Sequence, residues 1–366
     1  MKIECTKEKL LKAVSKAEKI TGKNLTLPVL SCLLIKTEGQ DVFIRSTNLD
    51  LGVELSFTAK VEEGGEVAIP AGIFGSYLST VSDTQNISLE TKDGGMSISS
   101  QAGSTFIKSQ PADDFPLIPV VPKEYVFSVK ASDFINGLRS VWYSSSVSSI
   151  KPELASVYIY QSEGSIFFVA TDSFRLAEKQ IINKNKSDFS PILIPYKNIT
   201  EIIRVLEEAP DNIEIAVTKN QISFSFQGAY LTSRVIEGVF PDYKQIIPKE
   251  FSTEVTILKQ DLVNALRIVN IFADKFNQVN FKINPKNKTL ELSTHNSDVG
   301  DSAKKLQGSF SGEELEINFN YKYIIDCFQS ISSDSVTLRF TGAHKPLLIS
   351  GTGDNSFTYL AMPMNR

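Results

Sequence analysis

Apolar residues recur with helical spacing at three places along the chain. The first set, Leu10, Val14 and Ala17, falls at i, i+4 and i+7. This spacing places the three side chains on one face of a helix. The same spacing returns in two later sets, Phe134, Leu138 and Val141, and Leu262, Leu266 and Val269. The pattern therefore predicts one helix that is used three times.

A second amphipathic helix is predicted in each third of the chain. Its apolar positions shift by 125 residues from one third to the next, and they are Phe74, Tyr77, Leu78 and Val81, then Ile199, Ile202, Ile203 and Leu206, then Ile324, Cys327, Phe328 and Ile331. Two such helices in each third need a sheet against which to bury their apolar faces.

The stretches between these helices alternate between apolar and polar residues, as half-buried strands do. Ser31 to Thr37 and Val42 to Thr47 flank Glu38-Gly39-Gln40, which indicates a β-hairpin. The other predicted strands include Lys2 to Thr6, Leu51 to Lys60, Leu154 to Gln161 and Ser165 to Ala170. The expected fold class is α+β, with two helices packed on antiparallel sheet in each third.

Separate landmarks return at one offset and indicate an internal repeat. Pro70 and Pro195 are 125 residues apart, and so are the paired motifs Phe115-Pro116 with Phe240-Pro241 and Tyr196-Lys197 with Tyr321-Lys322. A third of the 366 residues is 122, which fits three copies of one unit. Proline-rich connectors at the two joins suggest domains at residues 1–122, 123–249 and 250–366.

Composition agrees with an ordinary globular protein, with 42% apolar and 22% charged residues. Cys5, Cys32 and Cys327 are odd in number and far apart, which favours reduced thiols in the cytosol. Neither a signal segment at the N-terminus nor an apolar run long enough to cross a bilayer is recognisable in the sequence. We therefore expect an untargeted cytoplasmic protein that has no contact with a membrane.

Lysines line the polar side of the first helix. They recur at i, i+3, i+7, i+10 and i+14, and they are Lys9, Lys12, Lys16, Lys19 and Lys23. The other two copies carry Asn136 and Asn264 at the position of Lys12, and they add Arg139 and Arg267. One interpretation is a solvated basic face, and the other is a polyanion shared by all three copies.

The net charge of −4 and the pI near 5.5 count against a protein that holds nucleic acid by affinity alone. The two observations agree if the basic faces point inward around an enclosed polyanion and the acidic residues lie outside. Weak phosphate contacts without sequence information would then allow the protein to slide.

Catalytic and metal-binding patterns are weak. His295 and His344 lack metal-ligand spacing, and His295 is expected at the hairpin position of Asp172 and Asn48. The remaining candidates are a carboxylate pair from Asp113-Asp114, Asp172 and Asp242, of which Asp114 and Asp242 flank repeated Phe-Pro connectors and are expected in turns. Gly351-Thr352-Gly353 lacks the last glycine of a dinucleotide fingerprint. We predict no enzyme activity, no cofactor and no metal.

Several motifs carry a resemblance to a known family. They are Leu27-Pro28-Val29-Leu30, Val169-Ala170-Thr171-Asp172-Ser173-Phe174-Arg175-Leu176-Ala177, Phe240-Pro241-Asp242-Tyr243 and Tyr359-Leu360-Ala361-Met362-Pro363-Met364. With them the whole chain resembles the bacterial DNA polymerase III β subunits, the β sliding clamps. The resemblance implies three clamp domains per chain and a head-to-tail homodimeric ring whose helices line a hole for duplex DNA. It implies a non-catalytic processivity subunit of the DNA polymerase III holoenzyme in DNA replication.

The resemblance also implies partners and sites. The partners would be double-stranded DNA, a second copy of the chain, the DNA polymerase III catalytic subunit, the clamp loader complex, and other clamp-binding-motif proteins such as repair polymerases, ligase and mismatch repair proteins. The partner-peptide pocket would comprise Lys151, Leu154, Thr171, Ser173, Phe174, Arg175, Leu176, Pro241, Ile246, Pro346, Leu360, Met362, Pro363 and Met364. The DNA-facing residues would be Lys9, Lys12, Lys16, Lys19, Lys23, Asn136, Arg139, Lys197, Arg204, Asn264, Arg267 and Lys322. The dimer interface would use Phe106, Ile107, Ile271 and Phe272.

Other interpretations stay open at this point. Leu154, Leu176 and Ile246 could be plain core residues, and Ile271 and Phe272 could belong to a small satellite core. Ser173-Phe174 stand where many family members carry Gly-His, and the chain ends in Asn365-Arg366 where an arginine followed by an apolar residue is common, so partner preference could differ. The alternative function is a repeat scaffold that binds peptides without DNA.

Overall fold

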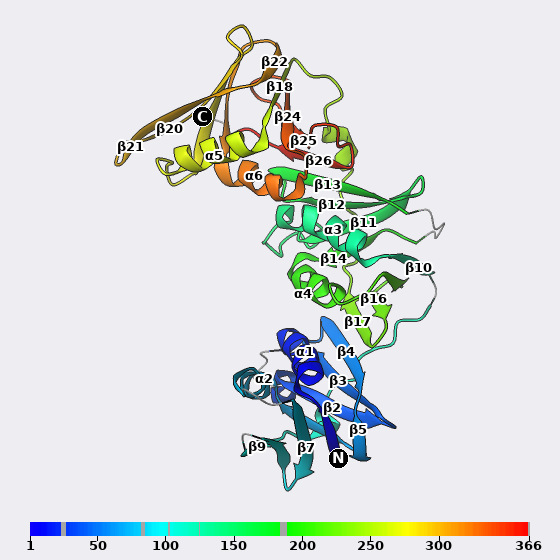
Figure 1. Ribbon diagram of the computed structural model, residues 1–366. Coiled ribbons are helices and arrows are strands. Elements are labelled where there is room, and N and C mark those ends of the chain that lie inside the picture. The colour runs from blue at the N-terminus through cyan, green and yellow to red at the C-terminus, as the bar shows by residue number, and fades with distance from the viewer. Residues whose placement is uncertain (23–26, 82–84, 102, 124, 184–188, 365–366) are drawn as a thin grey trace. The chain divides into compact units, whose positions relative to one another are not determined.

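The computed structural model describes residues 1–22, 27–81, 85–101, 103–123, 125–183 and 189–364 (Figure 1). The described residues form two compact units. Unit 1 holds those of Met1–Ile135, Ser187–Phe189 and Lys197–Val235, and unit 2 holds those of Asn136–Lys186, Ser190–Tyr196 and Ile236–Arg366. This division falls inside the second repeat, so the domain boundaries expected from the sequence stay a prediction.

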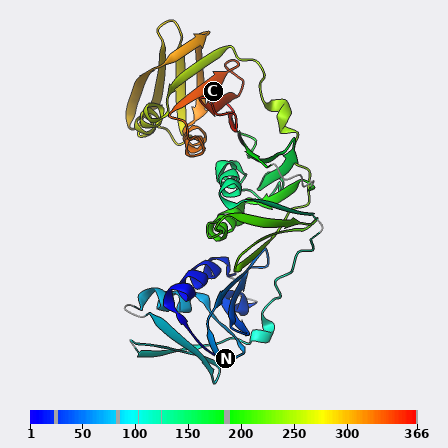
Figure 2. The same cartoon turned by 45° about the vertical axis from the view of Figure 1, so that its right-hand side comes forward.

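The three repeats run through a similar order of elements, except that the described residues of the second repeat contain one strand fewer between its two helices (Figures 1 and 2). The first contains β1 (Lys2–Thr6), α1 (Lys7–Ala17), β2 (Cys32–Glu38), β3 (Asp41–Thr47), β4 (Leu51–Thr58), β5 (Lys60–Glu63), β6 (Glu66–Pro70), α2 (Ala71–Thr80), β7 (Asn86–Lys92), β8 (Gly95–Ser100) and β9 (Gly103–Lys108). The second contains β10 (Tyr125–Lys130), α3 (Ala131–Val141), β11 (Ser156–Ser162), β12 (Ser165–Thr171), β13 (Arg175–Ile182), β14 (Ile192–Pro195), α4 (Tyr196–Leu206), β15 (Asn212–Val217), β16 (Gln221–Phe226) and β17 (Ala229–Arg234). The third contains β18 (Thr253–Leu258), α5 (Lys259–Asn270), β19 (Gln278–Asn284), β20 (Thr289–Asn296), β21 (Gly300–Gln307), β22 (Ser309–Gly312), β23 (Leu315–Asn320), α6 (Tyr321–Asp326), β24 (Ser335–Phe340), β25 (Leu347–Gly351) and β26 (Phe357–Ala361).

The strands form four antiparallel sheets, two in each unit. Unit 1 contains the orders β10-β15-β16-β17-β4-β3-β2-β6 and β5-β1-β7-β8-β9. Unit 2 contains the orders β14-β11-β12-β13-β26-β25-β24-β18-β22 and β21-β20-β19-β23. The longer sheet of each unit therefore continues from one repeat into the next, through the pairs β17·β4 and β13·β26. We call these two pairs seam 1 and seam 2.

The stripe predicted for the first helix of each repeat is confirmed, and the stripes predicted for the second helices are confirmed in part. Leu10, Val14 and Ala17 have no exposed surface, and Phe134, Leu138, Val141, Leu262, Leu266 and Val269 are equally buried. Phe74, Leu78, Ile199, Ile202, Leu206 and Ile324 of the second helices are also fully buried, whereas Tyr77 and Val81 are half-buried. Helix α6 ends at Asp326, so Cys327 and Phe328 lie in the 3₁₀ turn Cys327–Ser330 that follows it, and Ile331 lies beyond that turn. Each fully buried aliphatic side chain stabilises the fold by about 1.5–3 kcal/mol, so these faces hold the helices on the sheets.

The first helix is shorter than the lysine spacing suggests. α1 ends at Ala17, and a 3₁₀ turn follows at Glu18–Ile20. Lys19 therefore lies in this turn, and Lys23 lies outside the described residues. Of the four predicted lysines that the structure describes, Lys9, Lys12 and Lys16 lie on the α-helix.

All three cysteines are free and buried. Among the described residues, no helix is both long and apolar enough to cross a membrane.

Candidate functional site

The turn between β12 and β13 is built by its own polar side chains. Asp172 Oδ1 accepts hydrogen bonds from the backbone N–H groups of Phe174 (2.9 Å) and Arg175 (3.0 Å). The Thr171 hydroxyl donates to the Arg175 carbonyl (2.7 Å). Ser173, at φ 78°, takes the left-handed conformation that favours glycine. The turn therefore fixes Phe174 and Arg175 at the start of β13.

Arg175 is the most constrained charge at this end of seam 2. Its Nε donates to Asp172 Oδ2 (3.0 Å) and one terminal nitrogen donates to Asp326 Oδ2 (2.6 Å). The guanidinium carbon lies 4.8 Å from the centre of the Tyr323 ring. Burial lowers the pKa of Arg175, but Tyr359, Asp326 and Asp172 outweigh that effect and raise the pKa above its ordinary value. Arg175 is therefore a permanently charged side chain whose two ion pairs fix its position at this surface.

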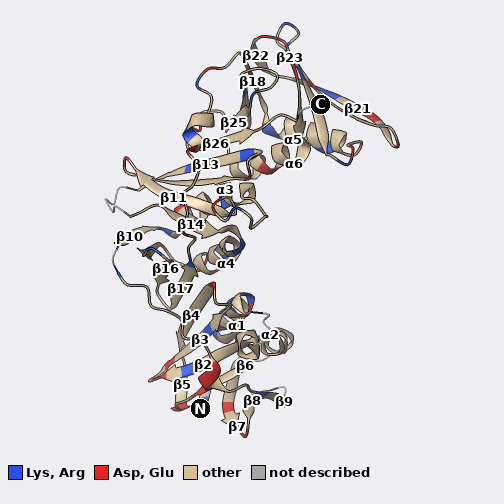
Figure 3. Cartoon of the chain, turned by 180° about the vertical axis from the view of Figure 1, so that it is seen from behind, with Lys and Arg blue, Asp and Glu red and all other residues tan. Residues whose placement is uncertain are grey.

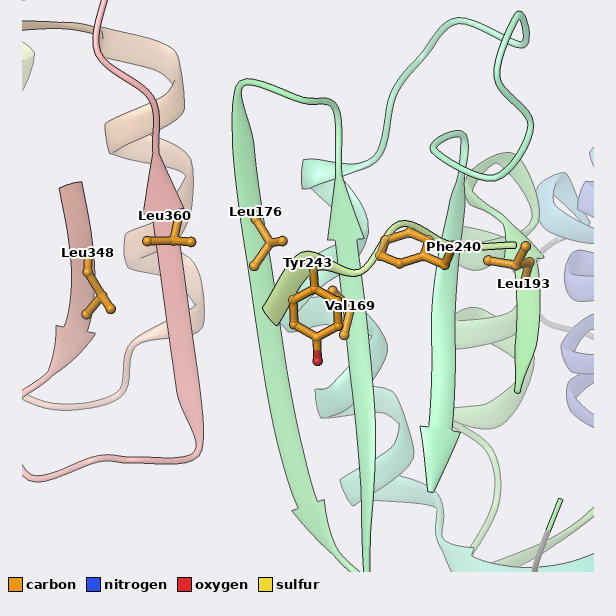
Figure 4. Packing of buried hydrophobic residues seen from close by; sticks show 7 residues of the cluster. All are labelled: Val169, Leu176, Leu193, Phe240, Tyr243, Leu348 and Leu360. Atoms are coloured by element: carbon orange, nitrogen blue, oxygen red, sulfur yellow. The ribbon is translucent and has the colours of Figure 1, made fainter. Parts of the chain in front are cut away.

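An apolar cluster lies beneath this surface, on one face of the sheet of seam 2 (Figure 4). Leu176 of β13 stands opposite Leu360 of β26, and Leu348 of β25 stands next along the sheet. Leu176 is 1% exposed and Leu360 is 2% exposed. The other members are Val169, Leu193, Phe240 and Tyr243. The floor of the predicted pocket is therefore packed.

Tyr243 connects this cluster to a polar group. Its hydroxyl lies 2.7 Å from the Tyr160 hydroxyl and donates to Glu178. Burial and the Glu178 carboxylate raise the pKa of Tyr243 above its ordinary value. The segment from Phe240 to Ile246 is thereby held across the strands.

Exposed apolar side chains form a rim around the packed floor. Phe174 is 59% exposed, Ile246 is 51% exposed and Met362 is 39% exposed. The C-terminal segment is tied down beside them, because Met362 N donates to the Phe174 carbonyl (2.8 Å) and Met364 N donates to the Asn318 carbonyl (2.9 Å). We call Phe174, Ile246 and Met362 the rim. Exposed apolar side chains that lie together are typical of surfaces that bind other proteins.

All fourteen residues of the predicted pocket fall in unit 2. Leu154, Thr171, Leu176 and Leu360 are buried, Arg175, Pro346, Pro363 and Met364 are half-buried, and Lys151, Ser173, Phe174, Pro241, Ile246 and Met362 are exposed. Sequence reasoning missed the residues that support them. Tyr243 lies inside a quoted motif and could have been found, whereas Asp326 and Tyr323 gave no signal.

Two cavities lie away from the rim. One, of about 200 Å³, lies in unit 1 beside α1, and the other, of about 640 Å³, lies over polar residues of the β21-β20-β19-β23 sheet in unit 2. The second cavity includes His295, whose Nδ1 contacts Asp301. Among the described residues, no three His, Cys, Asp or Glu side chains lie together as a metal site would need.

The position expected for His295 is wrong by one residue. Asn48 Oδ1 accepts from the N–H of Asp50 in the first repeat, as Asp172 does from Phe174 in the second. In the third repeat this bond runs from Asp298 N to Asn296 Oδ1. Asn296 therefore holds the turn position and His295 precedes it. Asn48, Asp172 and Asn296 follow one another at a constant offset of 124 residues, so the same spacing applied to the third repeat would have identified Asn296.

The basic positions on α1 are marked in Figure 3. Lys9, Lys12 and Lys19 are exposed, whereas Lys16 is half-buried. Lys12 and Lys16 both form ion pairs with Glu208. Two further candidates in unit 1 are also paired, Lys197 with Asp50 and Arg204 with Glu201. Several of the predicted basic side chains are therefore paired with carboxylates of the same chain, which the sequence pattern did not reveal.

The other predicted DNA-facing residues lie at the surface. Asn136, Arg139, Asn264, Arg267 and Lys322 are all exposed. Asn264 accepts a hydrogen bond from Gln260 (2.9 Å).

The predicted interface residues lie on or near two strands, β9 and β21, that end their sheets within the described part of the chain. β9 is an edge strand in unit 1, and there Phe106 is 49% exposed while Ile107 is 4% exposed. β21 is an edge strand in unit 2. Ile271 follows α5 and is 70% exposed, and Phe272 is half-buried near the start of β21, where an ideal Cβ on Gly300 would lie 4.0 Å from its ring. Open edges of this kind invite pairing with another chain.

Family models match nearly the whole chain. The N-terminal, central and C-terminal domains of the DNA polymerase III beta subunit match residues 1–119, 128–242 and 244–365. A beta sliding clamp of Synechococcus elongatus is 27% identical over 371 residues, covering 100% of this chain and 99% of the relative.

Solved structures are similar in fold. The DNA polymerase III subunit beta of Pseudomonas aeruginosa matches with a TM-score of 0.94 at 23% identity, with full coverage of both chains. A sliding clamp of Bartonella birtlesii, solved with bound griselimycin, matches with a TM-score of 0.93 at 26% identity, again over both full chains. A similar order of elements is repeated three times, and three domain models of one family match in sequence along the chain. The chain belongs to the DNA polymerase III beta subunit family, and its fold consists of three repeated clamp domains.

Proposed function

We propose that this chain is a non-catalytic sliding clamp, which encircles duplex DNA and tethers the replicative DNA polymerase for processive synthesis. The match of all three domain models of one family carries this proposal. The relatives named beta sliding clamp support it. Since bacterial DNA replication takes place in the cytoplasm, we place the protein there, with domains at residues 1–122, 123–249 and 250–366.

Ring closure is proposed from the two seams within the chain. Seam 1 pairs Val53 of β4 with Leu231 of β17, and seam 2 pairs Ala177 of β13 with Tyr359 of β26. Each seam joins the third strand of one hairpin set to the last strand of the next repeat. The strands left without this partner are β21 of the third repeat and β9 of the first, and both are edges. A second copy, arranged head to tail, would supply two more seams of the same kind.

The repeat also supplies a register for the contact between subunits. Val53, Ala177 and Ser302 face equivalent residues of the preceding strand, namely Ser46, Ala170 and Thr294. Leu231, Tyr359 and Thr105 likewise face Phe224, Ile349 and Ile98. Thr105 should therefore stand opposite Ser302 of the second copy. This register brings Ile107 opposite Gly300, beside Phe272.

A pair of cysteines tests that register. Antiparallel partners have Cα atoms about 4.5–5.5 Å apart, within the range that a disulfide spans. Thr105→Cys with Ser302→Cys should cross-link two chains under mild oxidation, as seen by non-reducing electrophoresis. Thr105→Cys with Lys304→Cys is the matched control and should not. Equal cross-linking of both pairs would contradict the register, and no dimer by native mass would contradict the ring.

We propose that the rim and its packed floor bind short peptides of polymerases and of other partners. Three exposed apolar groups stand on a rigid base, and each anchor side chain buried by a ligand contributes about 1.5–3 kcal/mol. The cost of ordering the peptide reduces this binding free energy, and the result is roughly micromolar affinity. Such binding is weak enough for partners to exchange. Binding of griselimycin by the Bartonella birtlesii clamp supports a ligand surface on this fold.

Retention on DNA tests the function as a whole. A ring that threads duplex DNA is held by topology, so protein loaded on a nicked circular plasmid should stay bound through gel filtration and leave when the plasmid is linearised. Lys12, Lys16 and Lys19 changed together to Glu should lower retention and leave the dimer intact. Equal retention on linear and circular DNA would contradict sliding and favour a scaffold that does not encircle DNA.

A further inference from the structure

A small cavity beside α1 gathers the lysines of this surface against an apolar wall. Lys9, Lys12 and Lys16 line one side of it, and Phe57 and Phe226 contribute to the other. Its volume of about 200 Å³ compares with about 30 Å³ for one water molecule in the liquid. The cavity therefore has room for a phosphate group.

One acidic side chain lines this cavity, and it serves two cations. Glu208, just after α4, contacts Lys16 through Oε1 and Lys12 through Oε2. With Lys9, three ammonium groups face a single carboxylate among the lining residues. The site thus holds a net positive charge although it is partly neutralised.

Lys16 has fewer hydrogen bonds than a buried ammonium group needs. Its side chain is only 12% exposed. Within the described part of the chain, its buried Nζ has the ion pair with Glu208 but no hydrogen bond of good geometry. Burial lowers the pKa of Lys16 to about 8, and Lys12 adds to the decrease while Glu207 opposes it. An anion with several oxygen acceptors would satisfy this ammonium better than one shared carboxylate does.

The arrangement belongs to the first repeat alone. The positions that match Lys12 and Lys16 are Asn136 and Ser140 in the second repeat. They are Asn264 and Ile268 in the third. Neither pair offers two cations to a shared anion.

We propose that this cavity is a phosphate site in which Glu208 occupies the place of the phosphate until DNA replaces it. The inference rests on the proposed function, which puts α1 against DNA. Binding of a backbone phosphate would then be an exchange of one anion for another. Such an exchange gains little free energy, so the clamp can hold DNA without adhering to any one phosphate.

Removal of the Glu208 charge tests this exchange. Glu208→Gln should raise the affinity for short linear duplex DNA about five- to ten-fold at low salt. The slope of log affinity against log salt should become steeper by about one, the value expected for one added phosphate contact. Glu54→Gln is the matched control, since it makes the same charge change at the Arg45–Glu54 pair, neither member of which lines the cavity, and should leave the slope unchanged. An equal rise in both variants would mean a general charge effect and would overturn the proposal.

A second measurement follows Lys16 itself by NMR of labelled lysine side chains in the full dimer. Bound phosphate should raise the pKa of Lys16, and inorganic phosphate and a short duplex are tested separately. A rise with both probes assigns the site to phosphate in general, and a rise with the duplex alone assigns it to the DNA backbone. No rise with either probe would overturn the site, even if retention on circular DNA shows that the clamp function holds.

Discussion

Seam 1 and seam 2 have the same backbone but different surfaces. In both, the turn before the seam has an Asn or Asp cap, Asn48 or Asp172, and then a residue in the left-handed conformation. That residue is Leu49 at φ 75° in seam 1 and Ser173 at φ 78° in seam 2. The repeat therefore reproduces the main chain closely and leaves the side chains to decide what each seam does.

The side chains on the seam make the difference. Seam 1 places Gly52 opposite Thr232, and the connector residue Ile118 packs directly onto the glycine. Seam 2 places Leu176 opposite Leu360, beneath Tyr243. Leu51, which is buried, stands where seam 2 has Arg175. Seam 1 is thus closed by its own connector, whereas seam 2 is surrounded by the exposed rim.

Loss of the Arg175 charge should destabilise seam 2 more than the other substitutions at the seams. Arg175→Met leaves Asp172 and Asp326 without their cation, and loss of hydrogen bonds to charged groups costs about 1.5–3 kcal/mol of unfolding free energy. Urea unfolding followed by the fluorescence of Trp142, the only tryptophan, reports unit 2. Arg339→Met, which breaks the more exposed Arg339–Glu254 pair of the same unit, should cost less than about 1 kcal/mol. Equal losses in the two variants would show that Arg175 is an ordinary surface cation.

A side chain at Gly52 should clash with Ile118 and destabilise seam 1. The Cβ of Gly52→Ala would lie 3.0 Å from Ile118 Cγ2, and overpacking of this kind costs about 1–3 kcal/mol. Ile118→Ala in the same chain should recover part of the loss, measured as a double-mutant cycle by circular dichroism. Gly72→Ala in α2, which meets open space, is the control and should stabilise the helix slightly. Additive effects of Gly52→Ala and Ile118→Ala would refute the contact.

Tyr243 adds a hydrogen bond at seam 2. Ile118, which covers seam 1, has no polar side-chain group that could make one. Tyr243→Phe removes the hydrogen bond to Glu178 and should cost about 1 kcal/mol at pH 7. Because the folded-state pKa of Tyr243 is raised, its contribution is present below pH 10 and is lost as pH rises through its folded-state value. The wild type should therefore lose stability above pH 10 more steeply than Tyr243→Phe. Parallel pH curves for the two proteins would contradict this account.

Glycine in the two turns should have the smallest effect. Ser173→Gly and Leu49→Gly each relieve a left-handed residue, which costs about 1–2 kcal/mol, but glycine adds freedom to the unfolded chain. A net stabilisation of about 0.5 kcal/mol is expected at both sites by thermal unfolding. A gain at one site and a loss at the other would show that the two turns are not equivalent.

The sequence predicted the repeated elements because their patterns are local. The helical stripes around Leu10, Phe134 and Leu262 and the hairpin around Gly39 each need only neighbours in the chain. Pairing of β4 with β17 was not predicted, because partners such as Val53 and Leu231 are far apart in sequence and no spacing rule connects them.

The same limit applies to the site. The stretch from Thr171 to Leu176 was recognised as a motif, and the structure shows that its own hydrogen bonds build the turn. Asp326, which holds Arg175 from 151 residues away, gave no signal. The lysines of α1 were treated as free charges, since nothing in the sequence connects Glu208 to them.

The three thiols have a practical consequence for experiments. Burial raises the pKa of Cys5 to about 11, and it also raises the pKa of Cys32 and of Cys327. The thiolate is the form that reacts with alkylating reagents, so the native chain should react very slowly with maleimide dyes. A fluorophore attached through one engineered surface cysteine would therefore mark a single known position. Single-molecule tracking could then be done without first replacing the three native cysteines.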